Sequence, residues 1–303
     1  MNHPVAVNQL QMNFSNKKII DNLSFQIPEG TTFGLLGSNG SGKTTIIRTL
    51  LGIYQPTSGT ALINGKKYSP ADIEGVGYLP EERGLYKKEI TLDVMIFFGK
   101  LRGLSGKEAK KRSLEFLEQM DIADKAKVRM DRLSGGQQQK VQLGVTLISD
   151  PKLLILDEPG KGFDPVNRRI LMGMISQHQK KGATIVLVTH DMSEVEKLCS
   201  QILLLKDGKA RAYGDLVRVQ QEFGGTYIEL IYSGRLPESD SFKISKEFAP
   251  EHLELQVKDG LSPSQIVQEL TNAKVEITLF RPHYRNMDEI FVEIYGEKAL
   301  KES

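Results

Sequence analysis

The chain has 303 residues, and its 40 lysines and arginines nearly balance its 38 aspartates and glutamates, which leaves a formal net charge of +2. Such a small net charge gives no electrostatic reason to expect a nucleic-acid partner. The 39% of hydrophobic residues is enough for ordinary cores, and the length is typical of about two domains. The single cysteine, Cys199, excludes an internal disulfide framework and a cysteine-rich zinc site.

The sequence predicts no membrane segment and no secretion signal. Residues 1–14 lack a basic stretch followed by an apolar core. The longest apolar runs, at 153–156 and 185–188, are far shorter than the roughly 20 residues that span a bilayer. We therefore expect a soluble, cytoplasmic chain, in which any membrane role comes through a partner.

Short apolar segments alternate with helical patterns along the first two thirds of the chain, which is typical of an α/β fold. Residues 31–37 predict a strand, and residues 44–52 predict a helix that ends at Gly52. Further short apolar runs, bounded by glycine, proline or polar residues, predict buried parallel strands at 76–80, 153–159 and 183–190.

A mostly helical insertion separates the strands expected at 76–80 and at 153–159. Its first helix, over 105–120, starts with Ser105 and Glu108 in the spacing of a capping box. A later helix starts at Ser134-Gly135-Gly136 and carries an apolar stripe that includes Val141 and Ile148, which predicts an amphipathic helix. The exposed backbone N–H groups at its start are typical of an anion site.

The pattern of predicted strands and helices changes near residue 224. Residues 201–215 predict a hairpin with Asp207-Gly208 at the turn, and residues 215–225 predict a short helix that ends in glycine. The order beyond it, strand, strand, helix, strand, helix, predicts a small α+β unit. We therefore divide the chain into an α/β domain at 1–224 and an accessory α+β domain at 225–303.

The segment GSNGSGKT fits the P-loop pattern G-x-x-x-x-G-K-[ST]. Its glycines allow the backbone to wrap around phosphates, Lys43 reaches the β- and γ-phosphates, and the Thr44 hydroxyl is placed to ligate Mg²⁺. A chance match is disfavoured because the segment lies between an expected strand and an expected helix. The predicted phosphate-binding residues are Gly37, Ser38, Asn39, Gly40, Ser41, Gly42, Lys43, Thr44 and Thr45.

Asp157 and Glu158 follow four apolar residues and are expected at the C-terminal tip of a buried strand, where α/β sheets hold ligands. Asp157 would serve the Mg²⁺ shell, as in other P-loop ATPases. Glu158 is free to polarise a water for attack on the γ-phosphorus. Without other motifs, two acidic residues after an apolar run would more often belong to a strand that leads into a solvated loop. The P-loop upstream favours a role in nucleotide binding and hydrolysis instead.

The ordered set GSNGSGKT, LSGGQ at 133–137, LLILDEP and His190 resembles the motifs of an ABC-type ATPase over residues 1 to about 224. The resemblance implies two nucleotide-binding domains that pair head to tail, so that each signature helix caps the ATP held by the other subunit. It implies that the γ-phosphate of the partner's ATP is bound by Ser134, Gly135, Gly136 and Gln137. Without this resemblance, the Ser-Gly-Gly turn would be only a helix cap.

The resemblance also assigns single positions. Phe14 lies where the family places an aromatic ring that stacks on adenine, although an isolated phenylalanine is usually a core residue. His190 matches the switch histidine that contacts the γ-phosphate, with a satisfied histidine at a strand end as the alternative. Asp164 is retained at a position that implies an inter-subunit contact.

The sequence departs from the family pattern in two places. Glu81 stands where the family usually has a glutamine that touches Mg²⁺ and links the site to the membrane partner. Glutamate keeps a metal-ligating oxygen but adds charge beside Asp157 and Glu158; the alternative is a solvated loop acid. In residues 160–165, Lys161 and Phe163 replace a small polar residue and a leucine, so the family's contact at Lys161 does not carry over.

The segment at 78–86, YLPEERGLY, and the tail that ends in NMDEIFVEIYG resemble ATP-binding subunits of ABC-2-type exporters, including the sodium-efflux ATPases. This resemblance implies an ATPase that uses ATP and Mg²⁺ and energises export through a separate membrane permease. The expected partners are that permease and a second ATP-binding subunit, identical or paralogous. The expected location is the inner face of the cell membrane, and no nucleic-acid partner is expected.

The main alternative is a soluble ABC ATPase that acts on ribosomes or DNA. Ribosome-acting members usually carry two ATPase domains, whereas this chain has one P-loop and one LSGGQ. Members that act in DNA repair are split by long coiled coils, and no sustained heptad run occurs here. A GTPase is disfavoured because the chain lacks an Asn-Lys-x-Asp segment, and a module without turnover is disfavoured by Glu158 and His190.

Overall fold

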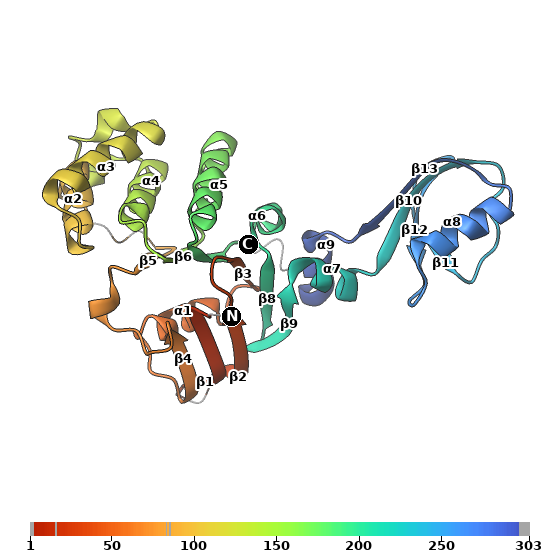
Figure 1. The fold of residues 1–303 in the computed structure, drawn as a ribbon, viewed down its shortest axis with the longest axis horizontal. Coiled ribbons are helices and arrows are strands. Elements are labelled where there is room, and N and C mark those ends of the chain that lie inside the picture. Colours follow the sequence, from red (N-terminus) through yellow and green to blue (C-terminus); the bar gives the residue numbers. More distant parts are fainter. Residues whose placement is uncertain (1–2, 16, 83, 85, 297–303) are drawn as a thin grey trace. The chain divides into compact units, whose positions relative to one another are not determined.

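The computed structural model of the chain describes residues 3–15, 17–82, 84 and 86–296 (Figure 1). It divides into two compact units, and the boundary along the chain lies between Tyr213 and Gly214. The boundary lies earlier than the expected one at 224, because the helix α7 (Leu216–Gly224) packs against elements of the second unit. The ends of the two expected domains, at 1–2 and 297–303, lie outside the described residues.

The first unit is built on a six-stranded sheet with the order β5-β6-β7-β3-β8-β9. The pairs β5–β6, β6–β7, β3–β7 and β3–β8 are all parallel, and every residue of β3, β6 and β7 is buried. This confirms the α/β prediction. The strands are β3 (Thr32–Leu36), β5 (Val76–Leu79), β6 (Leu153–Asp157), β7 (Thr184–Val188), β8 (Gln201–Lys206) and β9 (Lys209–Asp215).

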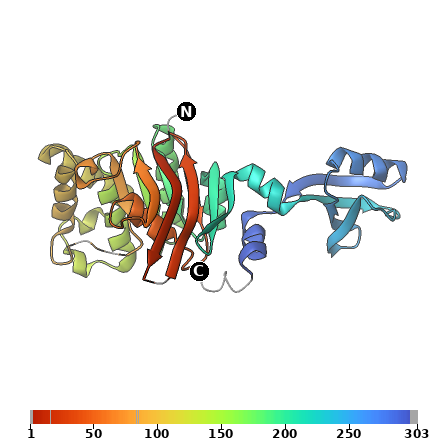
Figure 2. The ribbon, with the colours of Figure 1, turned by 90° about the horizontal axis from the view of Figure 1, so that it is seen from below.

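A second, antiparallel sheet has the order β2-β1-β4 and was not expected from the sequence. The strands β1 (Val5–Phe14) and β2 (Lys17–Ile27) run side by side in Figure 2, and β4 (Ser58–Ile63) pairs with the other edge of β1. Irregular registers between β1 and β2 interrupt the alternation of buried and exposed residues, which hides these strands from a period-of-two reading. Side chains of both sheets and of α1 (Lys43–Leu50) form one apolar core.

The insertion between β5 and β6 is helical, as expected, and contains α2 (Thr91–Leu101), α3 (Gly106–Gln119) and α4 (Gly135–Leu147) (Figure 1). Ser105 caps α3 by accepting a hydrogen bond from the Glu108 N–H at 3.2 Å. The prediction that α4 is amphipathic is wrong: every residue of 139–147 is buried, because α2, α3 and β5 all pack against this helix.

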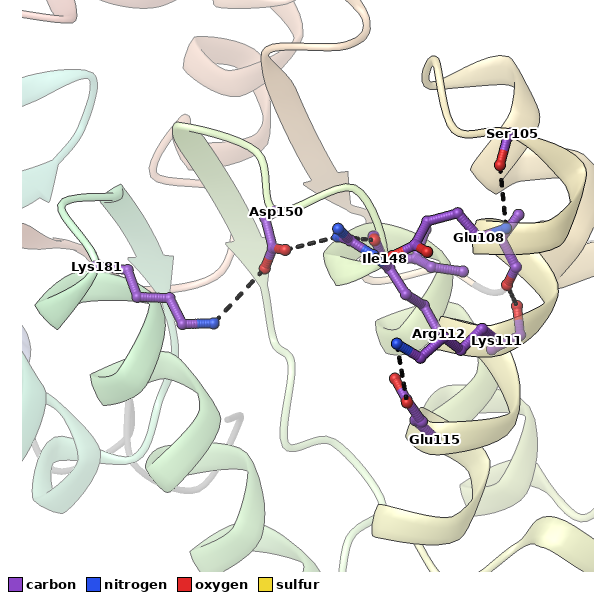
Figure 3. A network of polar contacts seen from close by, with 10 residues as sticks. Ser105, Glu108, Lys111, Arg112, Glu115, Ile148, Asp150 and Lys181 are labelled. Atoms are coloured by element: carbon purple, nitrogen blue, oxygen red, sulfur yellow. Dashed lines mark hydrogen bonds and ion pairs between the residues drawn. The ribbon is translucent and has the colours of Figure 1, made fainter.

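Arg112 connects α3 to the loop that leads into β6 (Figure 3). Its Nε lies 2.7 Å from Glu108 Oε1, and its Nη1 lies 2.6 Å from Asp150 Oδ2 and 3.1 Å from the Ile148 carbonyl oxygen. Asp150 in turn lies 3.9 Å from Lys181 Nζ, just after α5 (Pro165–Lys180). These pairs are half-exposed and contribute little to stability, but they fix the helical insertion to the base of β6.

The only cysteine of the chain lies directly after α6 (Met192–Leu198). Cys199 is buried, and burial raises the pKa of its thiol to about 12. A Cβ added to Gly34 on β3 would lie 3.2 Å from Cys199 Sγ, so the thiol packs tightly against the central sheet. The residue is a small buried apolar side chain, as expected.

The second unit is a four-stranded antiparallel sheet with the order β11-β12-β10-β13. The helix α8 lies on one face, where Ile266 and Leu270 join the core residues Ile228 and Leu255 (Figure 1). The strand β11 was not expected, because only its first residue is buried and its sequence shows no alternation. The elements are β10 (Thr226–Ser233), β11 (Phe242–Ala249), β12 (His252–Val257), α8 (Pro263–Asn272), β13 (Glu276–Tyr284) and α9 (Met287–Tyr295).

No helix within the described residues combines the length and the apolar character that a bilayer crossing requires.

Candidate nucleotide-binding site

A pocket of about 300 Å³ lies where β3, β6 and β7 end, and it unites residues from distant parts of the sequence. It contains most of the P-loop, the carboxylate at the end of β6 and the one directly after it, and the histidine after β7. The end of β1 contributes an aromatic ring. The sequence analysis did not predict that Lys17 and Ile19 line the pocket. Their closeness to Phe14 in the sequence was the only feature that could have indicated it. The lining residues are Phe14, Lys17, Ile19, Asn39, Gly40, Gly42, Lys43, Thr44, Thr45, Glu81, Asp157, Glu158 and His190.

The P-loop connects β3 to α1 and is held in shape by its own lysine. Lys43 Nζ donates to the carbonyl oxygens of Gly37 at 2.6 Å and Ser38 at 3.1 Å. Gly42, at the N-cap of α1, has a φ of +112°, and a Cβ there would lie 2.5 Å from Ile20 Cδ1, so only glycine fits. Burial lowers the pKa of Lys43, while the Glu158 and Asp157 carboxylates act in the opposite direction.

The two carboxylates after the apolar run occupy the predicted strand end. Burial, followed by the charge of Glu81, raises the pKa of Asp157 to about 6, whereas Lys43 and Lys161 act to lower it. Burial, followed by the neighbouring Asp157, raises the pKa of Glu158 to about 8. A carboxylate with a raised pKa is a stronger base, which suits a group that takes a proton from water.

Glu158 is also unusual in its backbone. Its φ is +49°, in the left-handed region, and its N–H donates to the Val188 carbonyl oxygen at 2.8 Å. Such a conformation is costly for a residue other than glycine and often occurs at functional sites. The hydrogen bond to β7 holds this residue where the two strands end.

His190 lies beside Glu158, with its Nε2 3.3 Å from Glu158 Oε1. Burial lowers the pKa of His190, and the positive charge of Lys43 lowers it further. The neutral imidazole is therefore favoured near pH 7, and one of its ring nitrogens can donate a hydrogen bond.

The pocket fits a nucleotide with a bound cation. Glu158 Oε1 lines the pocket, is buried and makes no hydrogen bond in the described part of the chain, although His190 Nε2 lies 3.3 Å from it. The P-loop residue Ser41 also has a buried Oγ without a hydrogen bond there, but it does not line the pocket. Among the described residues, no cluster of three or more histidine, cysteine or acidic side chains is placed to hold a metal alone. Mg²⁺ is usually bound through one or two protein oxygens together with the phosphates of a substrate, and Thr44 and Asp157 bring such oxygens to this pocket.

Phe14 lies at the end of β1 with 43% of its surface exposed, and its ring faces the pocket edge. Its ring meets that of Tyr54 edge to face, with centroids 5.2 Å apart and an interplanar angle of 76°. Tyr54 was not proposed from the sequence, because it is far from any motif. The tyrosine supports one edge of Phe14 and leaves the phenylalanine as the aromatic group of the pocket.

Two of the positions that depart from the family pattern, Glu81 and Lys161, contact each other. Glu81, which follows β5 and Pro80, lines the pocket, and its Oε1 accepts a hydrogen bond from Lys161 Nζ at 2.6 Å. Lys161 lies in the loop between β6 and α5. No pairing between these residues was predicted, because nothing local in the sequence connects positions so far apart.

The signature residues do not line this pocket. Ser134 is the N-cap of α4, and its Oγ accepts a hydrogen bond from the Gln137 N–H at 3.3 Å. In return, Gln137 Oε1 accepts from the Ser134 N–H at 2.9 Å, which completes a capping box. Within one chain, the segment from Ser134 to Gln137, with Gly135 and Gly136 between them, is thus a helix cap separate from the P-loop.

Asp164 is the N-cap of α5 and accepts hydrogen bonds from the N–H groups of Val166 and Asn167, both at 2.9 Å. The hydrogen bonds from Asn167 are the main reason why the pKa of Asp164 is lowered. Its inter-subunit role stays a prediction.

Both units match known families. Residues 20–161 match the ABC transporter family, and residues 214–295 match the C-terminal domain of DrrA1-3-like ATP-binding proteins. The chain is 39% identical over 266 residues to an uncharacterized ABC transporter ATP-binding protein of Methanocaldococcus jannaschii. The matched region covers 86% of this chain and 97% of that protein. It is 31% identical over 301 residues to a Nod factor export ATP-binding protein I of Mesorhizobium japonicum, covering 94% of this chain and 84% of that protein.

A solved structure of an ATP-binding subunit of an ABC transporter is similar to this chain, with a TM-score of 0.68 and 26% identity over 72% of this chain and 92% of that one. These similarities favour the transporter interpretation over a ribosome- or DNA-associated ATPase, and they agree with the pocket described above. The chain belongs to the ATP-binding subunits of ABC transporters, and its activity is the hydrolysis of ATP.

Proposed function

We propose that this subunit hydrolyses Mg·ATP in the pocket described above, together with a second ATP-binding subunit, and energises export through a separate permease. The observation that supports this most directly is the convergence of Phe14, Lys43, Asp157, Glu158 and His190 on one pocket. These side chains supply a stacking surface, a phosphate-binding cation, a metal ligand, a base and a hydrogen-bond donor.

ATP would lie with its adenine on the Phe14 ring and its phosphates in the P-loop. The backbone N–H groups at the start of α1 point toward the phosphates, and Lys43 would exchange the Gly37 and Ser38 carbonyl oxygens for phosphate oxygens. Oxygens of Thr44 and Asp157 would hold Mg²⁺, which supplies charge neutralisation on the phosphates.

Glu158 would accept the proton of the attacking water. Its pKa is raised, and its Oε1, which makes no hydrogen bond in the described part of the chain, is available to a water in the pocket. Neutral His190, 3.3 Å from that oxygen, would orient the same water and donate a hydrogen bond to the terminal phosphate.

A second subunit completes this proposal, because the signature turn lies outside the chain's own pocket. The proposed arrangement places Ser134 and the following backbone N–H groups against the ATP of the partner subunit. Asp164, at the exposed start of α5, would contribute to the same interface.

The permease is proposed to dock on an exposed aromatic cluster of the helical insertion. Tyr86 and Phe97 are 57% and 49% exposed, and their rings lie 6.0 Å apart. Together with Val94, Glu89 and Asp93 they line a pocket of about 340 Å³. An exposed apolar cluster with two acidic residues fits an amphipathic permease segment that carries a basic residue, and would hold the subunit at the cytoplasmic face of the membrane.

The accessory unit is proposed to act outside the chemistry, in assembly or regulation, because every residue that lines the nucleotide pocket precedes Gly214. The export direction rests on the relatives, whose names refer to Nod factor export and to linearmycin resistance.

The test is co-expression with candidate permeases of the same genome, followed by affinity purification in detergent and measurement of Mg·ATP hydrolysis. We expect a permease to copurify with the native chain and to be lost with the double variant Tyr86→Ser, Phe97→Ser. The matched control is Leu114→Ser, which removes a 41% exposed apolar side chain of α3 outside that pocket. Loss of the permease with the control variant as well would contradict the proposed docking surface.

A further inference from the structure

The ion pair between Glu81 and Lys161 joins two loops at the rim of the nucleotide pocket. Glu81 lines the pocket and follows β5, whereas Lys161 lies in the loop after β6. The Lys161 Nζ and the Glu81 Oε1 are 2.6 Å apart, which is a direct charge-assisted hydrogen bond.

Stability does not explain this pair. The two side chains are 59% and 45% exposed, and ion pairs so open to solvent contribute little to folding. Neither residue belongs to the apolar core of the first unit. An effect on the pocket that Glu81 lines is the alternative explanation.

The charges around the pocket give that explanation a physical basis. Glu81, Asp157 and Glu158 bring three carboxylates to a pocket that must accept the negative phosphates of ATP. Like charges at close range oppose binding, and a partially buried site screens them less than water does. Lys161 directly neutralises the carboxylate of Glu81, which is the most exposed member of the set.

The same pair also fixes where the carboxylate lies. A glutamate side chain in an exposed loop samples several rotamers, and a hydrogen bond to a lysine of a second loop restricts them. Lys161 therefore restrains the position of Glu81 relative to Asp157, the last residue of the neighbouring strand β6.

We propose that Lys161 is a positioning residue for Glu81, and that the ion pair offsets the charge of Glu81 so that the phosphates of ATP meet one negative charge fewer at the rim of the pocket. The inference rests on the ATP pocket assigned above. It predicts that the loss of Lys161 alone harms nucleotide binding more than the loss of both residues.

The experiment is a double-mutant cycle on the purified full chain, with the affinity for ATP measured by calorimetry in EDTA. In Lys161→Ser the uncompensated Glu81 should weaken ATP binding roughly threefold to tenfold, which lies in the lower part of the range of coupling between residues in contact. Glu81→Gln should bind ATP at least as tightly as the native chain, and the double variant should return close to native affinity. Lys161→Arg keeps the charge and should retain native affinity.

Two results would overturn the proposal. If Lys161→Ser weakens binding equally in the Glu81→Gln background, the lysine acts on the nucleotide directly and not through Glu81. If no variant changes the affinity, the pair has no role in nucleotide binding. Thermal unfolding of all variants without ATP should be nearly unchanged, which separates the effect from a loss of folding.

Two further variants make the outcome specific. Lys111→Ser removes an exposed lysine of α3 that pairs with Glu115 at 3.9 Å, so it matches the change in net charge away from the pocket and should leave ATP affinity native. Lys43→Ala tests the pocket itself. If Lys43→Ala abolishes binding while the cycle shows no coupling, only the inference about Lys161 fails; if Lys43→Ala binds ATP normally, the assigned pocket fails.

Discussion

The nucleotide pocket and the signature turn are both phosphate-binding motifs by sequence, yet they differ in how their polar groups are satisfied. In the pocket, Glu158 Oε1 is buried and makes no hydrogen bond among the described residues, although His190 Nε2 lies 3.3 Å from it. In the signature turn, Ser134 and Gln137 satisfy each other through a capping box. The pocket is thus prepared for a ligand within one chain, whereas the turn is complete without one.

Because of this difference, phosphate binding changes the hydrogen bonding of the two motifs in different ways. The pocket gains partners for atoms that lack them, so binding relieves an existing desolvation penalty. The turn has backbone N–H groups at the start of α4 to offer, and the Ser134 hydroxyl can donate its proton to a phosphate while its oxygen still accepts from the Gln137 N–H. The following substitutions test this contrast, from the largest expected effect to the smallest.

Lys43→Ala should abolish ATP turnover and strongly weaken ATP binding. The lysine is the buried cation of the P-loop, and its Nζ also holds the loop through the Gly37 and Ser38 carbonyl oxygens. Calorimetry and a phosphate-release assay on the purified variant measure both effects. A nearly native hydrolysis rate would contradict the assignment of the pocket.

Glu158→Gln should retain ATP binding but slow hydrolysis by roughly 10²–10⁴-fold, the usual contribution of a general base. The amide preserves the size of the side chain but cannot accept the proton, so ATP persists. Gel filtration in the presence of Mg·ATP should then show a stable dimer. A monomer that still hydrolyses ATP would rule out both the base and the shared site.

Ser134→Arg should spare ATP binding by the isolated chain and block hydrolysis, because an arginine at this turn obstructs the partner's nucleotide. Mixed with Lys43→Ala subunits, it should regain part of the activity, since one site of each mixed dimer carries both changes and the other carries neither. Phosphate release measured across mixing ratios provides the test. No recovery, with mixed dimers shown to form, would contradict the shared site.

Ser134→Ala should cost about 1 kcal/mol of unfolding free energy, the usual effect of losing an N-cap, and should also reduce hydrolysis. Ser105→Ala is the matched control, because Ser105 caps α3 with the same geometry and lies outside the pocket and the signature. It should lose similar stability in urea unfolding and keep its activity. Equal ATP hydrolysis by the two variants would show that Ser134 acts only as the N-cap of α4.

The fold and the pocket were predictable from the sequence to different extents. The parallel strands were visible because buried strands are continuous apolar runs, and the P-loop and the pair after β6 were visible because their chemistry restricts the residue types. The strands β1 and β2 were not visible, since their irregular pairing breaks the alternation, and β11 was not visible because it is almost wholly exposed.

Other features depend on packing, which no local pattern encodes. The glycines Gly224 and Gly225 suggested a boundary after α7, but the buried Leu216 and Val219 attach that helix to the second unit. The burial of α4 on all sides follows from its three neighbours, and its own sequence shows only part of that surface. The contact between Glu81 and Lys161 arises only because β5 and β6 are adjacent in the sheet.

The burial of Cys199 has a practical consequence for spectroscopy. It is the only cysteine of the sequence, and a thiol that is 6% exposed with a pKa of about 12 reacts poorly with maleimides or methanethiosulfonates at neutral pH. A cysteine introduced at an exposed position such as Val166 would therefore be labelled selectively without replacing Cys199. Pulsed electron resonance between two copies labelled at that position would then report directly on nucleotide-driven association of the native sequence background.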